Sequence, residues 1–236
     1  MATPYATVHL GTVDSTQDEA RSRATAGDQP VLVVAERQTT GRGRSGRRWE
    51  QAPRALFSSL AFFPSWPAET WPRLTLVAGL AVHGALAAHT EVEPGLKWPN
   101  DLVSGAGKLG GILTEAEAAG RGGLVVIGCG VNLWWPDPDR PAGVAAACDQ
   151  DPGRDLARRL AAAWATEVLE VMAEEPDAWD RTAYRAACVT LGAEIAWEPD
   201  GTGTAVDIDG GGGLVVETAT GTVTLVAGEV HNVRRR

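Results

Sequence analysis

The 236-residue sequence predicts an α+β fold in two parts, a main domain over residues 1–187 and a small β-barrel over residues 188–236. In the first part, apolar β-branched runs and segments with helical spacing are interspersed. From Leu191 onward the helical spacing disappears, and short runs of Val, Thr and Leu are separated by glycine-containing turns. The composition, 44% hydrophobic and 22% charged, is that of a globular chain able to bury a core.

The elements up to residue 62 follow from apolar runs and turn residues. Tyr5 to Val13 is predicted as a strand. Ser15 or Thr16 then offers an N-cap, with an acidic residue three positions later, for a short helix that ends near Gly27. Apolar runs rich in β-branched or aromatic residues predict two further strands, at Val31 to Ala35 and at Ala55 to Phe62.

Between residues 72 and 188 the pattern changes from a helix to strands and back to helices. Pro72 to His89 is apolar nearly all round but is shorter than a membrane span, which predicts a buried helix. Apolar residues at helical spacing predict an amphipathic helix at Arg154 to Glu174, and Asp177 to Cys188 is predicted as a second helix. Three strands are predicted between the first and the second of these helices, at Leu96 to Trp98, Gly111 to Ala116 and Leu124 to Leu133.

The charge and cysteine content restrict the setting in which the chain works. Lys plus Arg number 21 and Asp plus Glu number 30, and this net charge of −9 argues against general binding of nucleic acid or anionic membranes. The three cysteines are odd in number and form no C-x-x-C pair, which favours a reducing compartment. The first residues lack the pattern of a secretory signal. We therefore expect a cytoplasmic protein in which any basic cluster is local.

One basic cluster stands out at Gly41 to Trp49, which has the sequence GRGRSGRRW. Glycines let the backbone approach a ligand closely, and guanidinium groups bind phosphate and carboxylate oxygens through paired hydrogen bonds. The combination predicts a loop that closes over an anion. An exposed Arg/Gly loop or an RGG-type RNA-binding piece shares this composition, but an RGG tract normally repeats and this segment does not.

A second polar segment runs from Lys97 to Asp101 and is followed by Lys108. Pro99 cannot continue a central strand, so the chain should turn there and present its polar residues at the strand end. We expect a hairpin whose mouth carries Lys97, Asp101 and Lys108. The alternative is a polar turn with an ordinary surface ion pair.

The third segment is Gly128-Cys129-Gly130-Val131-Asn132, after an apolar run. Two glycines inside a strand mark a bulge or the close approach of another group to the backbone, such as a ligand ring. Cys129 is predicted to be a small buried hydrophobic residue rather than a nucleophile, because no neighbouring group is evident that would lower its pKa.

Taken together, these segments resemble one family. GRGRSGRRW, KWPND, KLGGIL and GCGVNL occur in the order and at the separations of the signature segments of biotin protein ligases. Ser-Thr-Gln at 15–17 is similar to the ST[NQ] segment of that family, and Gly203 to Asp209 with Gly228 to Val230 resembles its C-terminal domain. The resemblance implies a mixed β-sheet catalytic domain flanked by helices, of the class II aminoacyl-tRNA synthetase-like type, and an SH3-like C-terminal barrel.

Some members of the family carry an N-terminal winged helix that binds DNA. Here the Gly/Arg segment begins at residue 41, and the residues before it are needed for a strand, a helix and a second strand. We therefore expect the single-function type, without a DNA partner.

The resemblance also implies roles for individual residues. The catalytic residues would be Lys108, Arg44, Arg47 and Asp101. The residues expected around biotin are Ser15, Thr16, Gln38, Gly41, Arg42, Gly43, Lys108, Gly110, Gly111, Gly128 and Gly130. Those expected around ATP and the adenylate are Arg44, Arg47, Trp49, Lys97, Trp98, Asn100 and Asn132. Taken by themselves, Ser15 fits a helix cap equally well, and the tryptophans fit ordinary core packing.

Members of the family join biotin to a carrier lysine through biotinyl-5′-AMP, with loss of pyrophosphate. The biotin carboxylate is already ionised at pH 7, so the first step needs positioning and charge neutralisation rather than a base. Lys108 would contact the biotin carboxylate and the α-phosphate, while Arg44 and Arg47 would bind phosphate oxygens. In the second step Asp101 either accepts the proton of the target lysine or only orients its loop. The four histidines show no ligand spacing, so Mg²⁺ would travel with ATP.

The implied partner is the biotin carboxyl carrier domain of an acyl-CoA carboxylase or a pyruvate carboxylase. We expect no membrane partner, and a monomer or weak homodimer. A lipoate or octanoate ligase with the same core, a biotin-sensing repressor and a non-catalytic biotin sensor are the alternatives. Because a closed loop would exclude the carrier, we also expect Gly41 to Trp49 to be mobile in the empty enzyme and to order with ligand.

Overall fold

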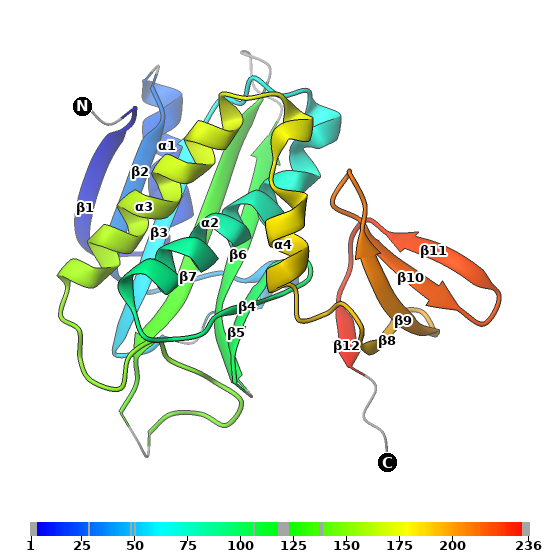
Figure 1. Cartoon of the computed structure of the whole chain (residues 1–236). Coiled ribbons are helices and arrows are strands. Elements are labelled where there is room, and N and C mark those ends of the chain that lie inside the picture. The colour runs from blue at the N-terminus through cyan, green and yellow to red at the C-terminus, as the bar shows by residue number, and fades with distance from the viewer. Residues whose placement is uncertain are drawn as a thin grey trace.

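A seven-stranded mixed sheet forms the centre of the main part of the protein (Figure 1). The structure is a computed structural model that describes residues 4–27, 29–47, 49, 51–105, 107–117, 123–136 and 139–232. The strands of this sheet are β1 (Ala6–Val13), β2 (Val31–Gln38), β3 (Arg54–Phe62), β4 (Gly95–Lys97), β5 (Asp101–Ser104), β6 (Gly107–Glu117) and β7 (Leu124–Trp134). They lie in the order β1-β2-β3-β7-β6-β5-β4, with β1 and β2 parallel and all other neighbours antiparallel.

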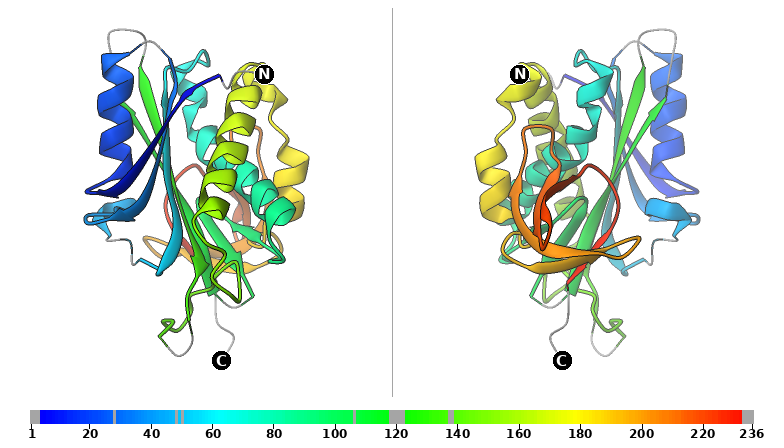
Figure 2. Two further views of the ribbon diagram at one scale, coloured as in Figure 1. Left: turned by 90° about the vertical axis from the view of Figure 1, so that its left-hand side faces the viewer. Right: turned by 90° about the vertical axis from the view of Figure 1, so that its right-hand side faces the viewer.

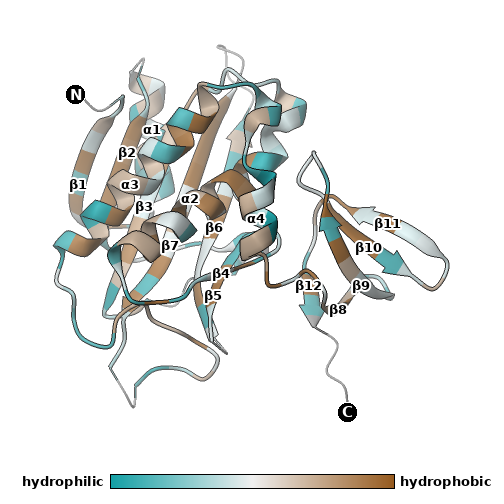
Figure 3. Ribbon diagram, viewed as in Figure 1, coloured by the Kyte–Doolittle hydropathy of each residue, from teal (hydrophilic) through white to brown (hydrophobic). Residues whose placement is uncertain are grey.

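Helices cover both faces of this sheet. Figure 2 shows α1 (Thr16–Ala26) on one face, and α2 (Leu74–His89), α3 (Asp155–Met172) and α4 (Arg181–Ala187) on the other. Strand β7 is apolar on both sides because both sides are covered. Its Val126 packs with Ala20 and Ala24 of α1, while the next residue, Ile127, joins the larger core beneath α2 and α3. The brown central strands in Figure 3 follow from this double burial.

A five-stranded antiparallel sheet forms the C-terminal part. Its strands are β8 (Glu194–Trp197), β9 (Gly201–Ile208), β10 (Leu214–Thr218), β11 (Gly221–Leu225) and β12 (Val230–Asn232). Their order, β11-β10-β9-β8-β12, places β11 and β12 at the two edges. The buried indole N–H of Trp98 donates to the carbonyl oxygen of Gly212 at 3.0 Å, which joins this sheet to the loop after β4. The exact domain boundary, expected between residues 187 and 188, stays a prediction.

The predicted α+β fold, with a helix-flanked mixed sheet and a separate C-terminal β part, is confirmed. The helix predicted over Asp177 to Cys188 is wrong at its start, because α4 begins only at Arg181. The carboxylate of Asp180 accepts a hydrogen bond from the backbone N–H of Ala183 at 2.8 Å and caps the helix there. Within the described residues, no helix combines the length and the apolar character needed to cross a membrane.

The predicted hairpin between Lys97 and Lys108 is a three-stranded meander instead. The turn after Pro99 is present, but Asp101–Ser104 forms an additional strand, β5, between β4 and β6. A second turn passes through Gly105, whose φ of 55° suits glycine. A strand of four residues is too short to show an alternating pattern, which explains why the sequence did not reveal it.

Candidate functional site

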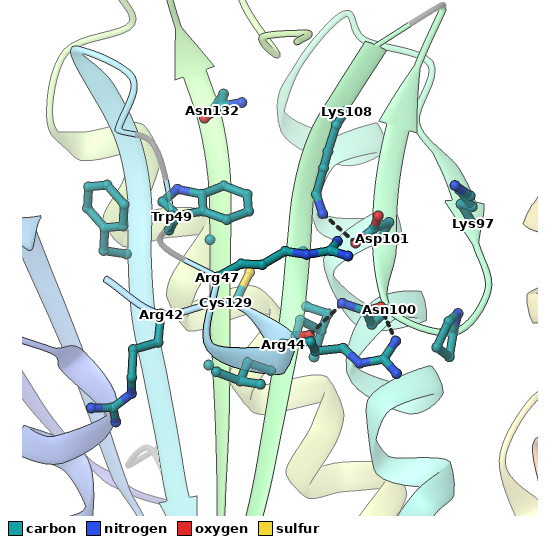
Figure 4. Close-up of a pocket in the computed structure, with 18 of the residues that line it drawn as sticks. Arg42, Arg44, Arg47, Trp49, Lys97, Asn100, Asp101, Lys108, Cys129 and Asn132 are labelled. Carbon is teal, nitrogen blue, oxygen red and sulfur yellow. Dashed lines mark hydrogen bonds and ion pairs between the residues drawn. The ribbon is translucent and has the colours of Figure 1, made fainter. Parts of the chain in front are cut away.

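A cavity of about 320 Å³ lies between the Gly41–Trp49 loop, the start of α1 and strands β5 to β7 (Figure 4). It collects side chains from every segment that the sequence analysis singled out. Of the predicted site residues, it is lined by Ser15, Thr16, Gln38, Arg42, Gly43, Arg44, Arg47, Trp49, Lys97, Trp98, Asn100, Asp101, Lys108, Gly111, Gly128, Gly130 and Asn132. Residues that are far apart in the chain thus share one cavity.

The floor of this cavity is backbone. Gly111 of β6 and Gly130 of β7 are register partners, and the indole of Trp49 lies over them. A Cβ at these positions would lie 3.6 and 3.3 Å from the ring, and a Cβ at Gly128 would lie 2.9 Å from the Gln17 Oε1. The close approach expected at the glycines is therefore made by Trp49 and Gln17, and the missing side chains leave room above the sheet.

Cys129, between two of these glycines, faces the opposite side of the sheet. Its side chain belongs to the core beneath α2 and α3, and burial raises the pKa of its thiol far above the usual range. A thiol held in its protonated form is a poor nucleophile. The structure thus agrees with its predicted role as a small buried hydrophobic residue.

One end of the cavity carries uncharged polar groups. The backbone N–H and the hydroxyl of Thr16 both donate to the Gln38 Oε1, at 2.8 and 3.0 Å. The buried Ser59 hydroxyl in turn donates to the Thr16 hydroxyl at 2.8 Å. Ser15 occupies the N-cap position of α1, but its hydroxyl makes no capping hydrogen bond. That hydroxyl can therefore serve a ligand, which weakens the interpretation of Ser15 as only a cap.

The other end of the cavity is cationic. Lys108 Nζ lies 2.7 Å from Asp101 Oδ1 and 5.8 Å from the centre of the Trp49 ring. Arg44 donates to Asn100 Oδ1 at 2.8 Å and to the carbonyl oxygen of Gly228 at 2.9 Å. The side chains of Arg44, Arg47 and Lys108 extend toward the corner formed by Asn100 and Asp101 (Figure 4). A ligand with a neutral polar head and an anionic tail matches this distribution of charge.

The C-terminal sheet contributes to this cationic end. Glu229, Val230 and His231 line the cavity, and Arg47 donates to Glu229 Oε2 at 2.6 Å. This hydrogen bond is the main cause that lowers the pKa of Glu229 below its usual value. The sequence analysis left open whether the C-terminal part reaches the site. It does so through the segment that begins β12.

Two of the predicted residues point elsewhere. The guanidinium of Arg42 forms a bidentate pair with Asp18 of α1, at 2.8 and 2.7 Å, and is directed away from Lys108 (Figure 4). Lys97 of β4 is the register partner of Asp101, but its side chain lies apart from the Asp101–Lys108 pair (Figure 4). Trp98 is 2% exposed and packs in the main core, so ordinary packing accounts for most of its surface.

Gly41 and Gly110 are predicted site residues that do not line the cavity, and both serve close packing. A Cβ at Gly110 would lie 2.6 Å from the carbonyl oxygen of Gly130, and one at Gly41 would lie 3.1 Å from Gln38 Nε2. Arg48, the fourth arginine of the loop, lies outside the described residues.

Asn132 is the most informative member of the cavity wall. Its Nδ2 donates to the carbonyl oxygen of Ala145 at 3.1 Å, while its buried Oδ1 has no partner. A buried acceptor without a partner is costly, so the site is suited to a ligand that supplies an N–H at this point. The exocyclic amine of adenine is such a donor.

Several cavity residues were not predicted. Gln17, Phe57, Ile112, Leu113 and Trp135 belong to segments next to predicted residues, whereas Val144 and the C-terminal residues come from elsewhere in the chain. Gln17 stands directly after the predicted Ser15 and Thr16, so the short motif was a usable signal. No local pattern indicates that residues 229–231 return to a loop at residue 44.

The described residues offer no preformed site for a metal ion. They contain no cluster of three or more His, Cys, Asp or Glu side chains arranged to hold a metal ion. The two carboxylates that line the cavity already have cationic partners, because Asp101 pairs with Lys108 and Glu229 pairs with Arg47. This donor set suits a metal that arrives with its own ligands.

Comparisons with known proteins agree with this geometry. The model of the biotin/lipoate A/B protein ligase family matches residues 10–132, and that of the biotin protein ligase C-terminal domain matches residues 199–231. The chain is 35% identical over 233 residues to the biotin--[acetyl-CoA-carboxylase] ligase of Mycobacterium tuberculosis, covering 91% of this chain and 84% of that protein.

Two further matches span nearly the whole chain. The biotin--[acetyl-CoA-carboxylase] ligase of Paracoccus denitrificans is 31% identical over 94% of this chain and 98% of its own length. The solved structure of the biotin protein ligase from Aquifex aeolicus in complex with biotin and ATP superposes with a TM-score of 0.74, at 26% identity, over 98% of this chain and 99% of that one. The chain therefore belongs to the biotin/lipoate A/B protein ligase family, and within it to the biotin protein ligases.

Proposed function

We propose that the chain activates biotin with ATP and transfers it to a lysine of a biotin carboxyl carrier domain, using the one cavity for both steps. The observation that carries this proposal is the polarity of the cavity. Uncharged hydrogen-bonding groups lie at one end, around Thr16 and Gln38, and cations lie at the other, around Arg44 and Lys108. Biotin has the same polarity, with a neutral ureido ring at one end and a carboxylate at the other.

In the first step, a carboxylate oxygen of biotin attacks the α-phosphorus of ATP, and pyrophosphate leaves. Both reactants are anionic, so the main task is to hold them in line and to neutralise their charge. We assign this task to Lys108, Arg44 and Arg47, whose side chains meet at one corner of the cavity. Each would exchange a present protein partner for ligand oxygens.

The polar end favours biotin over lipoate or octanoate. Ser15, Thr16 and Gln38 are polar groups that line the cavity, and the first two are buried. The ureido group of biotin supplies both N–H donors and a carbonyl acceptor to such groups, whereas a dithiolane ring or an alkyl chain supplies none. Leaving buried polar groups unpaired is costly, and this cost supports discrimination against the apolar acids.

In the second step, the target lysine must lose its proton before it attacks the acyl carbon of the adenylate. Asp101 is the carboxylate nearest to Lys108 and lines the same cavity, so we assign it the role of accepting that proton. The ε-amine then forms an amide bond with biotin, and AMP leaves with the electron pair of the broken C–O bond. When Mg²⁺ is bound to the phosphates of ATP, it supplies further neutralisation of charge.

The direct test incubates the chain with biotin, MgATP and a biotin carboxyl carrier domain. Mass spectrometry should find one added biotinyl group on one lysine of the carrier. Parallel reactions with lipoate and octanoate separate the alternatives, because a lipoate ligase would label the carrier only with those acids. Absence of any biotin transfer, with binding of biotin intact, would favour a sensor.

Asn132 should determine the affinity for ATP but not for biotin. Replacing it by alanine removes the one free acceptor at Oδ1, and we expect the KM for ATP to rise about fivefold to tenfold, the value of one neutral hydrogen bond. The KM for biotin in the same variant is the internal control. A KM for ATP within twofold of the wild-type value would contradict the assignment.

The Gly41–Trp49 loop should become more protected when ligands bind. Its backbone closes on itself through hydrogen bonds from Trp49 N–H to Gly41 and from Gly43 N–H to Arg47, and its described arginines line the cavity that the ligands would enter. Hydrogen exchange of this segment, measured with and without biotin and ATP, should slow when both are present. Equal exchange in the two states would disprove closure of the loop.

A further inference from the structure

Arg42 lies between two glycines of the Gly41–Trp49 loop, yet it does not share the corner to which Arg44 and Arg47 point (Figure 4). Its two terminal nitrogens donate to both carboxylate oxygens of Asp18, at 2.8 and 2.7 Å. Asp18 belongs to the first turn of α1, directly after the residues that line the polar end of the cavity. This fork joins the loop to the element that carries that end.

The fork is part of a larger charged network. Arg21 contacts Asp18 at 3.1 Å and Glu115 of β6 at 2.6 Å, and Glu115 also accepts a hydrogen bond from Gln17 Nε2 at 3.0 Å. Half-exposed ion pairs usually contribute little to stability, but bidentate geometry within a network is the exception. The hydrogen bond from Arg42 lowers the pKa of Asp18 below its usual value and so favours the ionised carboxylate.

The other anchors of the loop differ from this one. Arg44 bonds to Asn100 and to Gly228, and Arg47 bonds to Glu229. Both guanidinium groups line the end of the cavity that we assign to phosphate, so their hydrogen bonds are the ones that a ligand would rearrange. Among the loop arginines that the structure describes, only Arg42 pairs with a carboxylate that does not line the cavity. Its pair can therefore persist through the reaction.

We propose that Asp18 is a positioning residue: it holds Arg42, and with it the base of the loop, against α1 while Arg44 and Arg47 change partners. The inference rests on the proposed function, because it supposes an adenylate that the loop must retain. The hydrogen bond from Gly43 N–H to Arg47, at 2.7 Å, ties the two halves of the loop together. A fixed Arg42 consequently restrains both halves.

The test compares Asp18→Asn with Glu19→Gln. Both variants remove one negative charge from the first turn of α1, but within the described part of the chain the ion pair of Glu19 is with Arg23 of its own helix. Hydrogen exchange of residues 41–49 is measured first without ligands. The escape of biotinyl-adenylate is then measured without a carrier domain. We expect Asp18→Asn to speed hydrogen exchange of the loop and escape of the adenylate about tenfold, which corresponds to the loss of one hydrogen bond to a charged group. Glu19→Gln should change neither rate by more than about twofold.

Two further measurements separate positioning from a general structural effect. The kcat of biotin-dependent ATP–pyrophosphate exchange should stay within about twofold of wild type in Asp18→Asn, since the reacting groups are intact. Adding Asp18→Ala to Arg42→Ala should give no additional escape, because the two residues act as one unit.

The outcomes are distinct. Unchanged exchange of the ligand-free loop in Asp18→Asn would overturn the proposed anchor, and additive escape in the double variant would show that Asp18 does not act through Arg42. Faster exchange with unchanged escape would overturn its role in retention. A wild-type chain that forms no adenylate would instead overturn the proposed function. Hydrogen exchange of the ligand-free loop would still show whether the Arg42–Asp18 pair anchors it.

Discussion

Lys108→Ala is expected to lower the rate of biotin-dependent ATP–pyrophosphate exchange by about 10²- to 10³-fold, the usual effect of removing one preorganised group that stabilises a developing charge. Lys108 is the cation that faces Asp101 and the Trp49 ring, at the corner where Arg44 and Arg47 also converge. Its ammonium group is the one we assign to both the biotin carboxylate and the α-phosphate. The side chain of Lys97, the other lysine of the cavity, lies apart from this corner in Figure 4.

The fold of this variant should remain intact. The Lys108 side chain is 44% exposed, and an exposed ion pair contributes only about 0 to 1 kcal/mol to stability, so the unfolding midpoint should change little. Lys108→Arg keeps the charge but spreads it over a planar group, and it should restore only part of the rate. A rate of ATP–pyrophosphate exchange within about threefold of wild type in Lys108→Ala would refute the assigned role.

Most of the main part of the fold could be predicted because its elements are long and local. Helix α3 shows its apolar residues at helical spacing, and Leu156, Leu160, Trp164 and Val168 on the face they form are all buried. The elements that were missed or misplaced depend on other forces. Strand β5 is only four residues long, and the start of α4 is fixed by one capping hydrogen bond, which the Asp180 carboxylate accepts from the Ala183 N–H.

For the candidate site, the sequence predicted which segments contribute but not where their side chains point. The segments around residues 41, 97 and 128 were found because glycine, arginine and lysine in these patterns have few structural uses. The segment at residues 15–17 was found by its resemblance to a family motif. The direction of each side chain was beyond the sequence. Arg42 and Arg44 stand two residues apart in one motif, yet one binds Asp18 and the other binds Asn100. That difference depends on where α1 and β5 lie in space, and the contribution of Glu229 depends on how the C-terminal sheet docks.

Arg44→Ala should weaken the retention of biotinyl-adenylate. The guanidinium of Arg44 already bridges Asn100 of the sheet and the backbone of Gly228, so it is held where the loop, the sheet and the C-terminal part meet. Loss of a charge-assisted hydrogen bond to the phosphate should speed escape of the adenylate about 10- to 100-fold. Free adenylate acylates amines nonselectively, so a lysine-rich bystander protein should gain biotin in the absence of a carrier.

The lysine content of the chain limits the labelling of the chain itself in this measurement. Its only two lysines, Lys97 and Lys108, both line the cavity, and every other basic side chain is arginine or histidine. Since guanidinium groups stay protonated, arginine side chains do not compete for escaping adenylate, and labelling of the bystander is read separately from any labelling of the chain. Arg23→Ala removes an exposed arginine that pairs within α1 and should leave the bystander unlabelled. Equal labelling by wild type, Arg23→Ala and Arg44→Ala would show that Arg44 does not retain the intermediate.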